Sequence, residues 1–558
     1  MSRLIVTERG FDADLQSGLQ ERGDRILDLD ERDQFRGDAP SIDAAERQAH
    51  YDHALTLAQR WHLTTPEVTT YRDVSLGAVV ENAVWQQLQE LLIRWSLIER
   101  AVGRGGVTSI VVAGSSWTTQ VVRAAAPGVP VQRAPAQWGA RSRSPGRTEA
   151  MTRELKRAEL DRHARLTALL GKSSPSNTGA VDVVTVLEQP GAYLADAVLP
   201  VLDHFDRAAV LVFDPRHAST PTGPSRQVVS AARLTARHLP NLPGHLVRFA
   251  RKVRQLRLPK EIEALPIGAL ARTLFRRVIR RRLPVVALEV DAAYRFLEER
   301  KVRAMVLYSD AHHAGRLMTL VGARRSIPSV VVQHGATFNA FGYLPLYATR
   351  FAAWGETSKA WLQERGAPED RVVVTGNPRH DRYAGASPRS GPGFHLLWAV
   401  GPAPDPENEA LFADLRGALA AMEDLVLVVR LHPAMARPSW LPPASDRILH
   451  SPSSRDLCDA LAEVDGVVTQ GSTVGVDAAC LGLPVIVHEI DAPAHPAPAV
   501  FDALAVASAR GAAALVDALS AVREGRLDAR RQEAAARYAH RIDGRSAERV
   551  AALARALM

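Results

Sequence analysis

Cysteine is scarce in this chain of 558 residues, which has only Cys458 and Cys480. Both lie in apolar helical contexts, so the sequence supports neither a disulfide framework nor a zinc cluster. The start of the chain lacks the apolar core of a signal peptide, and no run of about 18 apolar residues occurs. These absences predict a protein of the reducing cytoplasm that does not cross a membrane by its own sequence.

Acidic motifs of the kind that hold a metal ion are also sparse. No Asp-x-Asp follows a predicted strand beyond residue 385, and the triplets at 12–14 and 28–30 lie near the start, where we expect them to be solvated. Nothing in the sequence therefore requires a bound metal.

What is present first is a set of regular elements. Residues 1–177 contain short strand-like pieces and one long amphipathic helix, 76–102, whose apolar residues recur at three- and four-residue steps. This predicted N-terminal α/β domain ends in a polar stretch, 140–177, typical of a surface helix between linkers. It carries no motif that we can attach to chemistry.

Strands and helices alternate from residue 178 onward, which predicts right-handed crossovers and doubly wound parallel sheets. We expect one Rossmann-like domain at 178–385, with a basic helical insert at 245–283. A smaller Rossmann-like domain follows at 386–558 and includes the C-terminal helices. The Pro- and Gly-rich segment 376–393 interrupts both periodicities and fits a hinge.

The candidate site is organised around residues 329–335. Ser329 and three valines predict a strand covered on both faces within a parallel sheet. The chain then breaks into Gln333, His334 and Gly335, so His334 lies at the carboxyl end of that strand. Ligands of open α/β sheets bind outside these ends. A lone histidine there would merely cap a turn, but polar residues at neighbouring strand ends favour a site.

Two neighbouring corners of the first Rossmann-like domain are polar. Asp310 and His312 follow one predicted strand, and Asn377 and Arg379 follow another. Each pair alone could be turn chemistry. Together with the corner at 333–335, they predict the lining of a cleft between two domains.

The second Rossmann-like domain has its own polar strand ends. Arg430 and His432 end the strand 425–431. A second corner leads from the strand 466–469 into a helix that contains Asp477, and it consists of Gln470, Gly471, Ser472 and Thr473. Such a corner is either an ordinary N-cap or an anion site built from hydroxyls and backbone N–H groups. The cation one strand away favours phosphate.

These motifs, in this order, resemble GT-B transferases of bacterial surface-polysaccharide synthesis. The resemblance covers residues 181–558 and rests on Gln-His-Gly, on Thr-Gly-Asn-Pro and Arg-Leu-His-Pro after strands, and on Ser-Thr opening a helix that leads to Gly-Leu-Pro. The nearest groups in pattern are CDP-glycerol glycerophosphotransferases, capsule glycosyltransferases and bacterial sialyltransferases. Thr-Gly-Asn and the closing Ile-Asp-Gly also resemble non-hydrolysing UDP-N-acetylglucosamine 2-epimerases.

The resemblance implies roles for individual residues. His334 would be the general base that deprotonates the acceptor hydroxyl, and His432 would contact the donor phosphate. Ser472 and Thr473 would grip the nucleotide phosphate or ribose. The chemistry agrees, because a histidine titrates near neutral pH and can take a proton from an attacking hydroxyl. A CMP/CDP or UDP type donor would be a substrate, and no cofactor is implied.

This chain departs from the pattern of these families at two places. The helix after Thr473 carries Asp477 where these families commonly have Glu, and Gln470-Gly471 replaces the usual Asp-Tyr. Both departures bear on which donor is bound.

A basic segment stands apart from these motifs. Between Arg248 and Arg282, Lys and Arg alternate with apolar residues against only Glu261 and Glu263. Basic amphipathic helices suit an anionic membrane surface, where each Lys or Arg contributes roughly 1 kcal/mol. The alternative is a solvated helix pair packed on the first domain. Sparse aromatic residues and the lack of a recognisable module argue against nucleic acid.

The sequence thus predicts an α/β GT-B transferase with an additional N-terminal domain, cytoplasmic and peripheral at the inner face of the cell membrane. It would move a sugar or polyol phosphate from a nucleotide-activated donor to a glycan or lipid-linked acceptor. The alternatives are a nucleotide-sugar 2-epimerase and a non-catalytic nucleotide-sugar-binding protein.

Overall fold

The chain forms two compact units in a computed structural model: unit 1 comprises residues 1–177 and 231–296, and unit 2 comprises residues 178–230 and 297–558. The structure describes residues 2–8, 17, 19, 23–29, 42–135, 138, 179–188, 192–213, 226–335, 340, 342–385, 389, 391–401, 405–432, 435, 437–489, 501 and 504–558. The predicted surface helix within 140–177 lies outside these residues. Among the described helices, none combines the length and apolarity that a membrane span requires.

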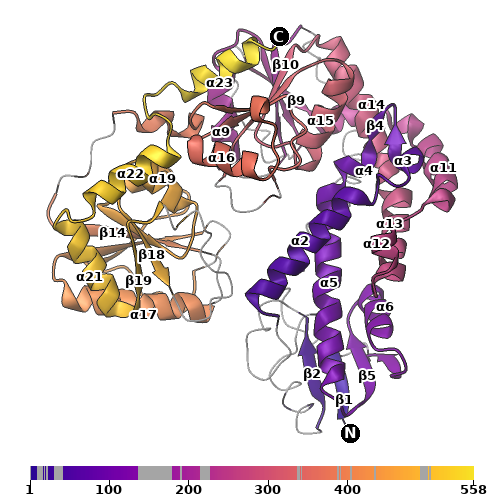
Figure 1. Cartoon of the computed structure of the whole chain (residues 1–558), viewed down its shortest axis with the longest axis horizontal. Coiled ribbons are helices and arrows are strands. Elements are labelled where there is room, and N and C mark those ends of the chain that lie inside the picture. The colour runs from indigo at the N-terminus through magenta and orange to yellow at the C-terminus, as the bar shows by residue number, and fades with distance from the viewer. Residues whose placement is uncertain are drawn as a thin grey trace. The chain divides into compact units, whose positions relative to one another are not determined.

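Unit 1 contains a four-stranded parallel sheet of order β2-β1-β5-β6 (Figure 1). Its strands are β1 (Ser2–Thr7), β2 (Arg25–Asp28), β5 (Val107–Ala113) and β6 (Val131–Arg133), with helix α6 (Ser116–Ala125) after β5. The long helices α2 (Ala44–Arg60) and α5 (Glu81–Gly103) pack on each other. The apolar stripe expected over 76–102 is interrupted at Val80, so a short helix α4 (Leu76–Val79) precedes α5.

The rest of unit 1 holds the basic helices. The elements are α3 (Pro66–Thr69), the hairpin β3 (Thr70–Tyr71) and β4 (Val74–Ser75), α10 (Ala231–Ala236), α11 (Leu242–Lys252), α12 (Lys260–Glu263), α13 (Gly268–Arg281) and most of α14 (Leu283–Glu299). Phe275 of α13 stacks on Trp61 with ring centroids 4.8 Å apart. The basic segment, expected as an insert of the first Rossmann-like domain, is therefore part of unit 1, because its apolar side chains are buried there.

Unit 2 begins with a seven-stranded parallel sheet of order β13-β12-β11-β10-β7-β8-β9. Its strands are β7 (Val183–Leu187), β8 (Ala208–Val212), β9 (Arg226–Ser230), β10 (Ala304–Leu307), β11 (Ser329–Val332), β12 (Arg350–Ala353) and β13 (Val372–Val374). Helices α9 (Ala192–Leu202), α15 (His313–Arg324) and α16 (Glu356–Glu364) cover it, and η5 (Pro378–Tyr383) follows β13. The strand order reverses between β7 and β10, which makes their carboxyl ends the switch point of this sheet.

A second, six-stranded parallel sheet has the order β16-β15-β14-β17-β18-β19. Its strands are β14 (Phe394–Val400), β15 (Leu425–Leu431), β16 (Ile448–His450), β17 (Gly466–Thr469), β18 (Val485–Glu489) and β19 (Ala507–Arg510). Its helices are α17 (Asp405–Ala421), α18 (Leu457–Ala462), α19 (Val474–Cys480), α21 (Gly511–Arg523) and α22 (Asp528–Tyr538). The order reverses between β14 and β17, so this switch point lies beside the corner at 470–473.

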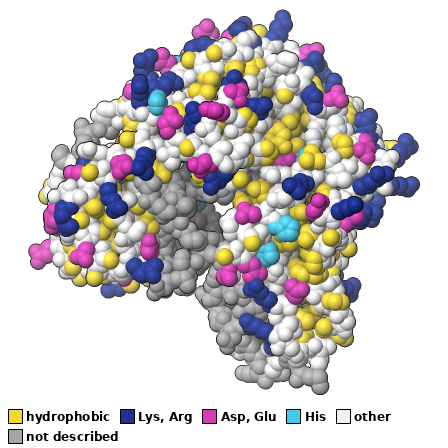
Figure 2. All heavy atoms as spheres, in the orientation of Figure 1, with side chains coloured by type: hydrophobic (Ala, Val, Ile, Leu, Met, Phe, Trp, Pro, Cys, Tyr) yellow, Lys and Arg dark blue, Asp and Glu magenta, His cyan; other side chains and the backbone are white. Residues whose placement is uncertain are grey.

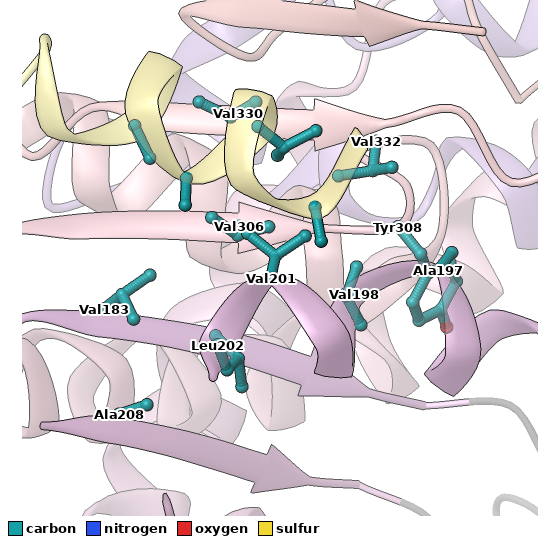
Figure 3. Close-up of a cluster of buried hydrophobic side chains, with 14 of the residues drawn as sticks. Val183, Ala197, Val198, Val201, Leu202, Ala208, Val306, Tyr308, Val330 and Val332 are labelled. Carbon is teal, nitrogen blue, oxygen red and sulfur yellow. The ribbon is translucent and has the colours of Figure 1, made fainter. Parts of the chain in front are cut away.

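The last helix, α23 (Ser546–Arg555), packs on the first sheet of unit 2. Its Val550 shares a core with Val201 of α9 and with Val306 and Val330 of the strands (Figure 3). The Asp381 carboxylate accepts hydrogen bonds from the backbone N–H groups of Ser546 and Ala547, both at 2.8 Å, and so caps the helix. We expected the C-terminal helices in the second domain, but the apolar face of α23 belongs to the first.

The expected α/β class is confirmed: the protein has two Rossmann-like parallel sheets and an additional N-terminal α/β part with its own parallel sheet. The domain boundaries at residues 177 and 385 stay predictions.

Candidate functional site

The corner after β11 is built by the side chain of Gln333, which is fully buried. Its Oε1 accepts from the Trp354 backbone N–H at 2.9 Å, and its Nε2 donates to the Gly335 carbonyl at 2.9 Å. Gln333 and Gly335 thereby shape the turn that carries His334.

His334 lies half-buried within this turn and faces aromatic rings. The Tyr343 ring stacks on the imidazole, with centroids 5.4 Å apart and planes 16° apart, and the Tyr343 hydroxyl donates to the Gly335 carbonyl at 2.8 Å. The His334 Nδ1 is buried and has no hydrogen-bond partner among the described residues. An imidazole fixed in this way keeps one nitrogen for a ligand.

Burial lowers the pKa of His334 to about 4. A hydrogen bond to the Tyr308 backbone acts against this shift, and the positive charge of Arg379 acts with it. The ring is therefore neutral at pH 7. If the other nitrogen donates to Tyr308, Nδ1 carries the lone pair and is the proton acceptor.

Asp310 and His312, at the neighbouring strand end, have different surroundings. The buried Asp310 carboxylate accepts from the backbone N–H groups of Tyr347 and Ala348 at 2.7 and 2.8 Å. Burial raises its pKa, against the Arg316 charge and these hydrogen bonds. Asp310 thus holds a loop in place. The His312 ring lies 6.0 Å from that of His334, and burial lowers its pKa to about 3, with His334 and Arg316 contributing.

Asn377 and Arg379 belong to a buried polar network that reaches the second sheet of unit 2. Arg379 and His380 both contact Asp477 Oδ1 on α19, His380 at 2.8 Å. Asn377 orders the turn: its Oδ1 accepts from the Arg379 N–H at 3.1 Å, and its Nδ2 lies 2.9 Å from His380 Nε2. The residues assigned from the sequence to opposite sides, Arg379 and Asp477, are ion-paired.

The charges of this network shift the pKa values of its members. Burial acts to raise the pKa of Asp477, but the Arg379 charge and the contact with His380 outweigh it, so the pKa is lowered. Burial lowers the pKa of His380 despite Asp477. Since the Arg379 charge also acts on His334, a chain of interactions runs from His334 to α19.

The corner after β17 is held by Thr469. Its hydroxyl accepts from the backbone N–H groups of Gly471 at 3.2 Å and Ser472 at 2.9 Å. Ser472 Oγ in turn accepts from the Val474 N–H at 3.3 Å. We expected free N–H groups for an anion here; instead, these three are used by side chains of the corner itself. The Thr473 side chain is exposed and makes no cap hydrogen bond.

Arg430, expected to bind the donor, is used by a neighbouring loop. Its Nη1 donates to Ser451 Oγ and the Pro452 carbonyl at 3.1 and 3.0 Å, and its Nη2 donates to the Arg455 carbonyl at 2.7 Å. His432 is exposed, and the Gln470 Nε2 is buried without a hydrogen-bond partner among the described residues. That His334 faces Arg430, His432, Ser472 and Thr473 across a cleft stays a prediction.

Four side chains that matter here were not selected from the sequence: Tyr343, His380, Thr469 and Glu188. Glu188 follows β7 at the switch point and accepts from the Ala314 N–H at 2.7 Å. Its position directly after a buried strand was a usable signal. Tyr343 gave none, because its stacking depends on the fold of a loop.

Two further features delimit the site. Among the described residues, no group of three or more His, Cys, Asp or Glu is placed to hold a metal ion. A cavity of about 400 Å³ is lined by Arg389, Asp465, Asp424 and Arg523 at the amino ends of β14, β15 and β17, the opposite edge of the second sheet. Its arginines are paired, Arg389 with Asp465 at 3.0 Å and Arg523 with Asp424 at 2.6 Å.

Residues 408–554 match the family model described as CDP-Glycerol:Poly(glycerophosphate) glycerophosphotransferase. The matched stretch contains Arg430, Ser472 and Asp477 but not His334. The resemblance inferred from the motifs is thus confirmed over most of the second Rossmann-like domain. No curated protein matches the chain.

Among solved structures, the chain is similar to a MnaA–UDP co-structure from S. aureus, at 16% identity and a TM-score of 0.41 over 66% of this chain and 94% of that one. It is also similar to a UDP-GlcNAc 2-epimerase from Neisseria meningitidis bound to UDP-GlcNAc, at 14% identity and a TM-score of 0.43 over 67% of this chain and 100% of that one. A third similar structure is the wall teichoic acid polymerase TagF, at 10% identity and a TM-score of 0.43 over 73% of this chain and 96% of that one. Likenesses of this size carry no inference about activity.

Proposed function

We propose that the protein is a transferase that moves a sugar or polyol phosphate from a nucleotide-activated donor of the CMP/CDP or UDP type to a cell-surface glycan acceptor. The match of residues 408–554 to a glycerophosphotransferase family supports the transfer reaction. That segment would bind the donor, with His432, Gln470, Ser472 and Thr473 nearest the nucleotide. The acceptor would bind by His334.

One observation carries this proposal: at a sheet's carboxyl edge, His334 Nδ1 has no hydrogen-bond partner within the described part of the chain, and Arg379 links His334 to Asp477 of α19. A neutral imidazole with a free lone pair is what base catalysis needs. This link supports electrostatic coupling between the candidate base and the helix that we propose to lie on the donor side.

In the proposed reaction, His334 Nδ1 takes the proton of an acceptor hydroxyl as that oxygen attacks the transferred group. The bond to the leaving nucleotide phosphate breaks, and the phosphate keeps the electron pair. Hydroxyls of Ser472 and Thr473 and the imidazole of His432 would stabilise that charge. The anionic donor would also favour the imidazolium that forms, raising the pKa of His334 from its low value in the free protein.

We further propose that the protein works at a membrane surface on a lipid-linked acceptor. The exposed arginines of α13 support this location.

The test is a nucleotide panel followed by a transfer assay with the full-length protein. Thermal shifts with CMP, CDP, UDP and GDP compounds should identify at least one stabilising nucleotide. The corresponding donor, CDP-glycerol first, should then release its nucleotide only when a glycan acceptor is added. Stabilisation by no nucleotide would contradict the proposal, and conversion of a UDP-sugar without acceptor would indicate an epimerase.

A further inference from the structure

The surface of α11–α13 concentrates the positive charge of the chain. Residues 245–283 contain twelve Lys or Arg against two Glu, an excess larger than the net charge of +8 for all 558 residues. Four of these side chains on α13 are exposed and form no ion pair with a described residue: Arg276, Arg277, Arg280 and Arg281. Figure 2 shows Lys and Arg side chains gathered over α11 and α13. Such a surface attracts an anionic partner.

The apolar faces of these helices are not available to that partner. Phe249, Ile262 and Phe275 are fully buried in unit 1. A helix lying in a membrane with its apolar face down would have to expose these residues. The interpretation of the segment as amphipathic membrane helices therefore does not hold in that form, although its charged face remains exposed.

Exposed apolar side chains occur beside the charges instead. Large hydrophobic residues are exposed at four described positions, and three of them lie in unit 1: Leu63 at 65%, Leu246 at 45% and Val247 at 51%, the fourth being Leu449 at 38% in unit 2. Leu63 lies in the turn between α2 and α3, and Leu246 and Val247 lie on α11.

Hydrogen bonds hold this turn and the basic helices together. Thr65 Oγ1 donates to the Arg257 carbonyl at 3.0 Å, and Lys252 of α11 donates to the Glu67 carbonyl of α3. These elements gather at the end of unit 1 away from its sheet (Figure 1). The exposed apolar residues and the arginines thus share one end of one compact unit.

We propose that this end of unit 1 docks on an anionic lipid bilayer, with Leu63, Leu246 and Val247 entering the headgroup boundary and the arginines of α13 at headgroup level. Apolar anchors combined with clustered cations are the two signals that together give stable peripheral binding. The inference deepens the membrane location named in the proposed function. It rests on that proposal only for its biological purpose.

The test measures sedimentation of the full-length protein with phosphatidylcholine vesicles that contain or lack phosphatidylglycerol. Replacing Leu246→Ser and Val247→Ser together should weaken binding to anionic vesicles about tenfold, and the residual binding should be lost at high salt. Leu449→Ser, an exposed leucine in unit 2, is the matched control and should bind like the wild type. Charge reversal of the four arginines by Arg→Glu should abolish binding to the anionic vesicles.

Unchanged binding of the Leu246→Ser, Val247→Ser variant would overturn the proposed insertion. Binding to a single-stranded RNA oligomer as tight as to anionic vesicles, and insensitive to the two serines, would point to nucleic acid and also overturn it. All four substituted arginines and both apolar positions are exposed, and thermal unfolding verifies that each variant is folded. The nucleotide panel needs no vesicles, so the two proposals fail separately.

Discussion

The carboxyl edges of the two sheets in unit 2 differ in how their polar side chains are hydrogen-bonded. On the first sheet, Gln333 satisfies the backbone of the corner, and one imidazole nitrogen of His334 has no partner among the residues that the structure describes. On the second, the Thr469 hydroxyl and the Arg430 guanidinium are themselves used up by backbone groups. A reactive group is therefore prepared at the first edge, and a rigid loop is prepared at the second. In the proposed function, chemistry takes place at the first edge and donor binding at the second.

Removing the reactive group should have the largest effect. His334→Ala should lower the rate of transfer about 100- to 10,000-fold, because a general base contributes that much. The thermal shift caused by the nucleotide should stay unchanged, since we propose that the nucleotide binds at the other edge. His313→Ala is the control, because His313 begins α15 on the same edge of the sheet. This variant should keep its activity. Full activity of His334→Ala would remove His334 as the base.

The pH profile sharpens the same prediction. Because the pKa of His334 in the free protein is lowered to about 4, the base stays deprotonated well below the usual titration of a histidine. We expect kcat/KM, which reports the free enzyme, to hold as pH falls through 6.5 and to drop only toward pH 4. A loss centred near pH 6.5 in the wild type would contradict the buried, neutral imidazole.

The ion pair of Arg379 with Asp477 connects the two edges, and breaking it should have the next largest effect. Asp477→Asn keeps the shape of the side chain but leaves the Arg379 guanidinium without its anion in a buried site. We expect the free energy of unfolding to fall by about 3–5 kcal/mol. Glu463→Gln, which breaks the exposed pair with Arg455, is the control and should cost about 0–1 kcal/mol. Urea denaturation measures both, and equal losses would show that the bridge is not a buried pair.

The loop at the second edge depends on one atom, the hydroxyl oxygen of Thr469. Thr469→Val removes the acceptor of two backbone N–H groups, so we expect a loss of about 1–3 kcal/mol and weaker nucleotide stabilisation. The first sheet supplies the control: Thr185 is fully buried, and its hydroxyl has no hydrogen-bond partner among the described residues. Thr185→Val should be neutral or stabilising. Similar losses in the two variants would mean that Thr469 does not organise the corner.

The comparison also shows what a sequence can and cannot reveal. The run Ser329 to Val332 specified a doubly covered strand, and its break at Gln333 specified the corner, because both depend on neighbouring residues. The pairing of Arg379 with Asp477 joins residues far apart in the chain, so local periodicity gave no sign of it. The helical pattern at the end of the chain likewise predicted C-terminal helices but not which sheet buries α23. The sequence shows that Thr469 has a hydroxyl and Arg430 a guanidinium. Which groups they bond to depends on the folded backbone.

The smallest effect should come from the ring that holds His334. Tyr343→Phe keeps the stacked face and loses only the hydrogen bond to Gly335, which we expect to cost about 1 kcal/mol of stability and leave the pKa of His334 unchanged. Tyr343→Leu removes the face as well. Because the face of an aromatic ring stabilises a cation by about 0.5–1 kcal/mol, the imidazolium should become harder to form and the pKa should fall below its present value. Titration of the His334 ring by NMR measures this without any substrate. An equal shift in both variants would assign the effect to the hydroxyl, and no shift in either would show that Tyr343 only fills space beside the base.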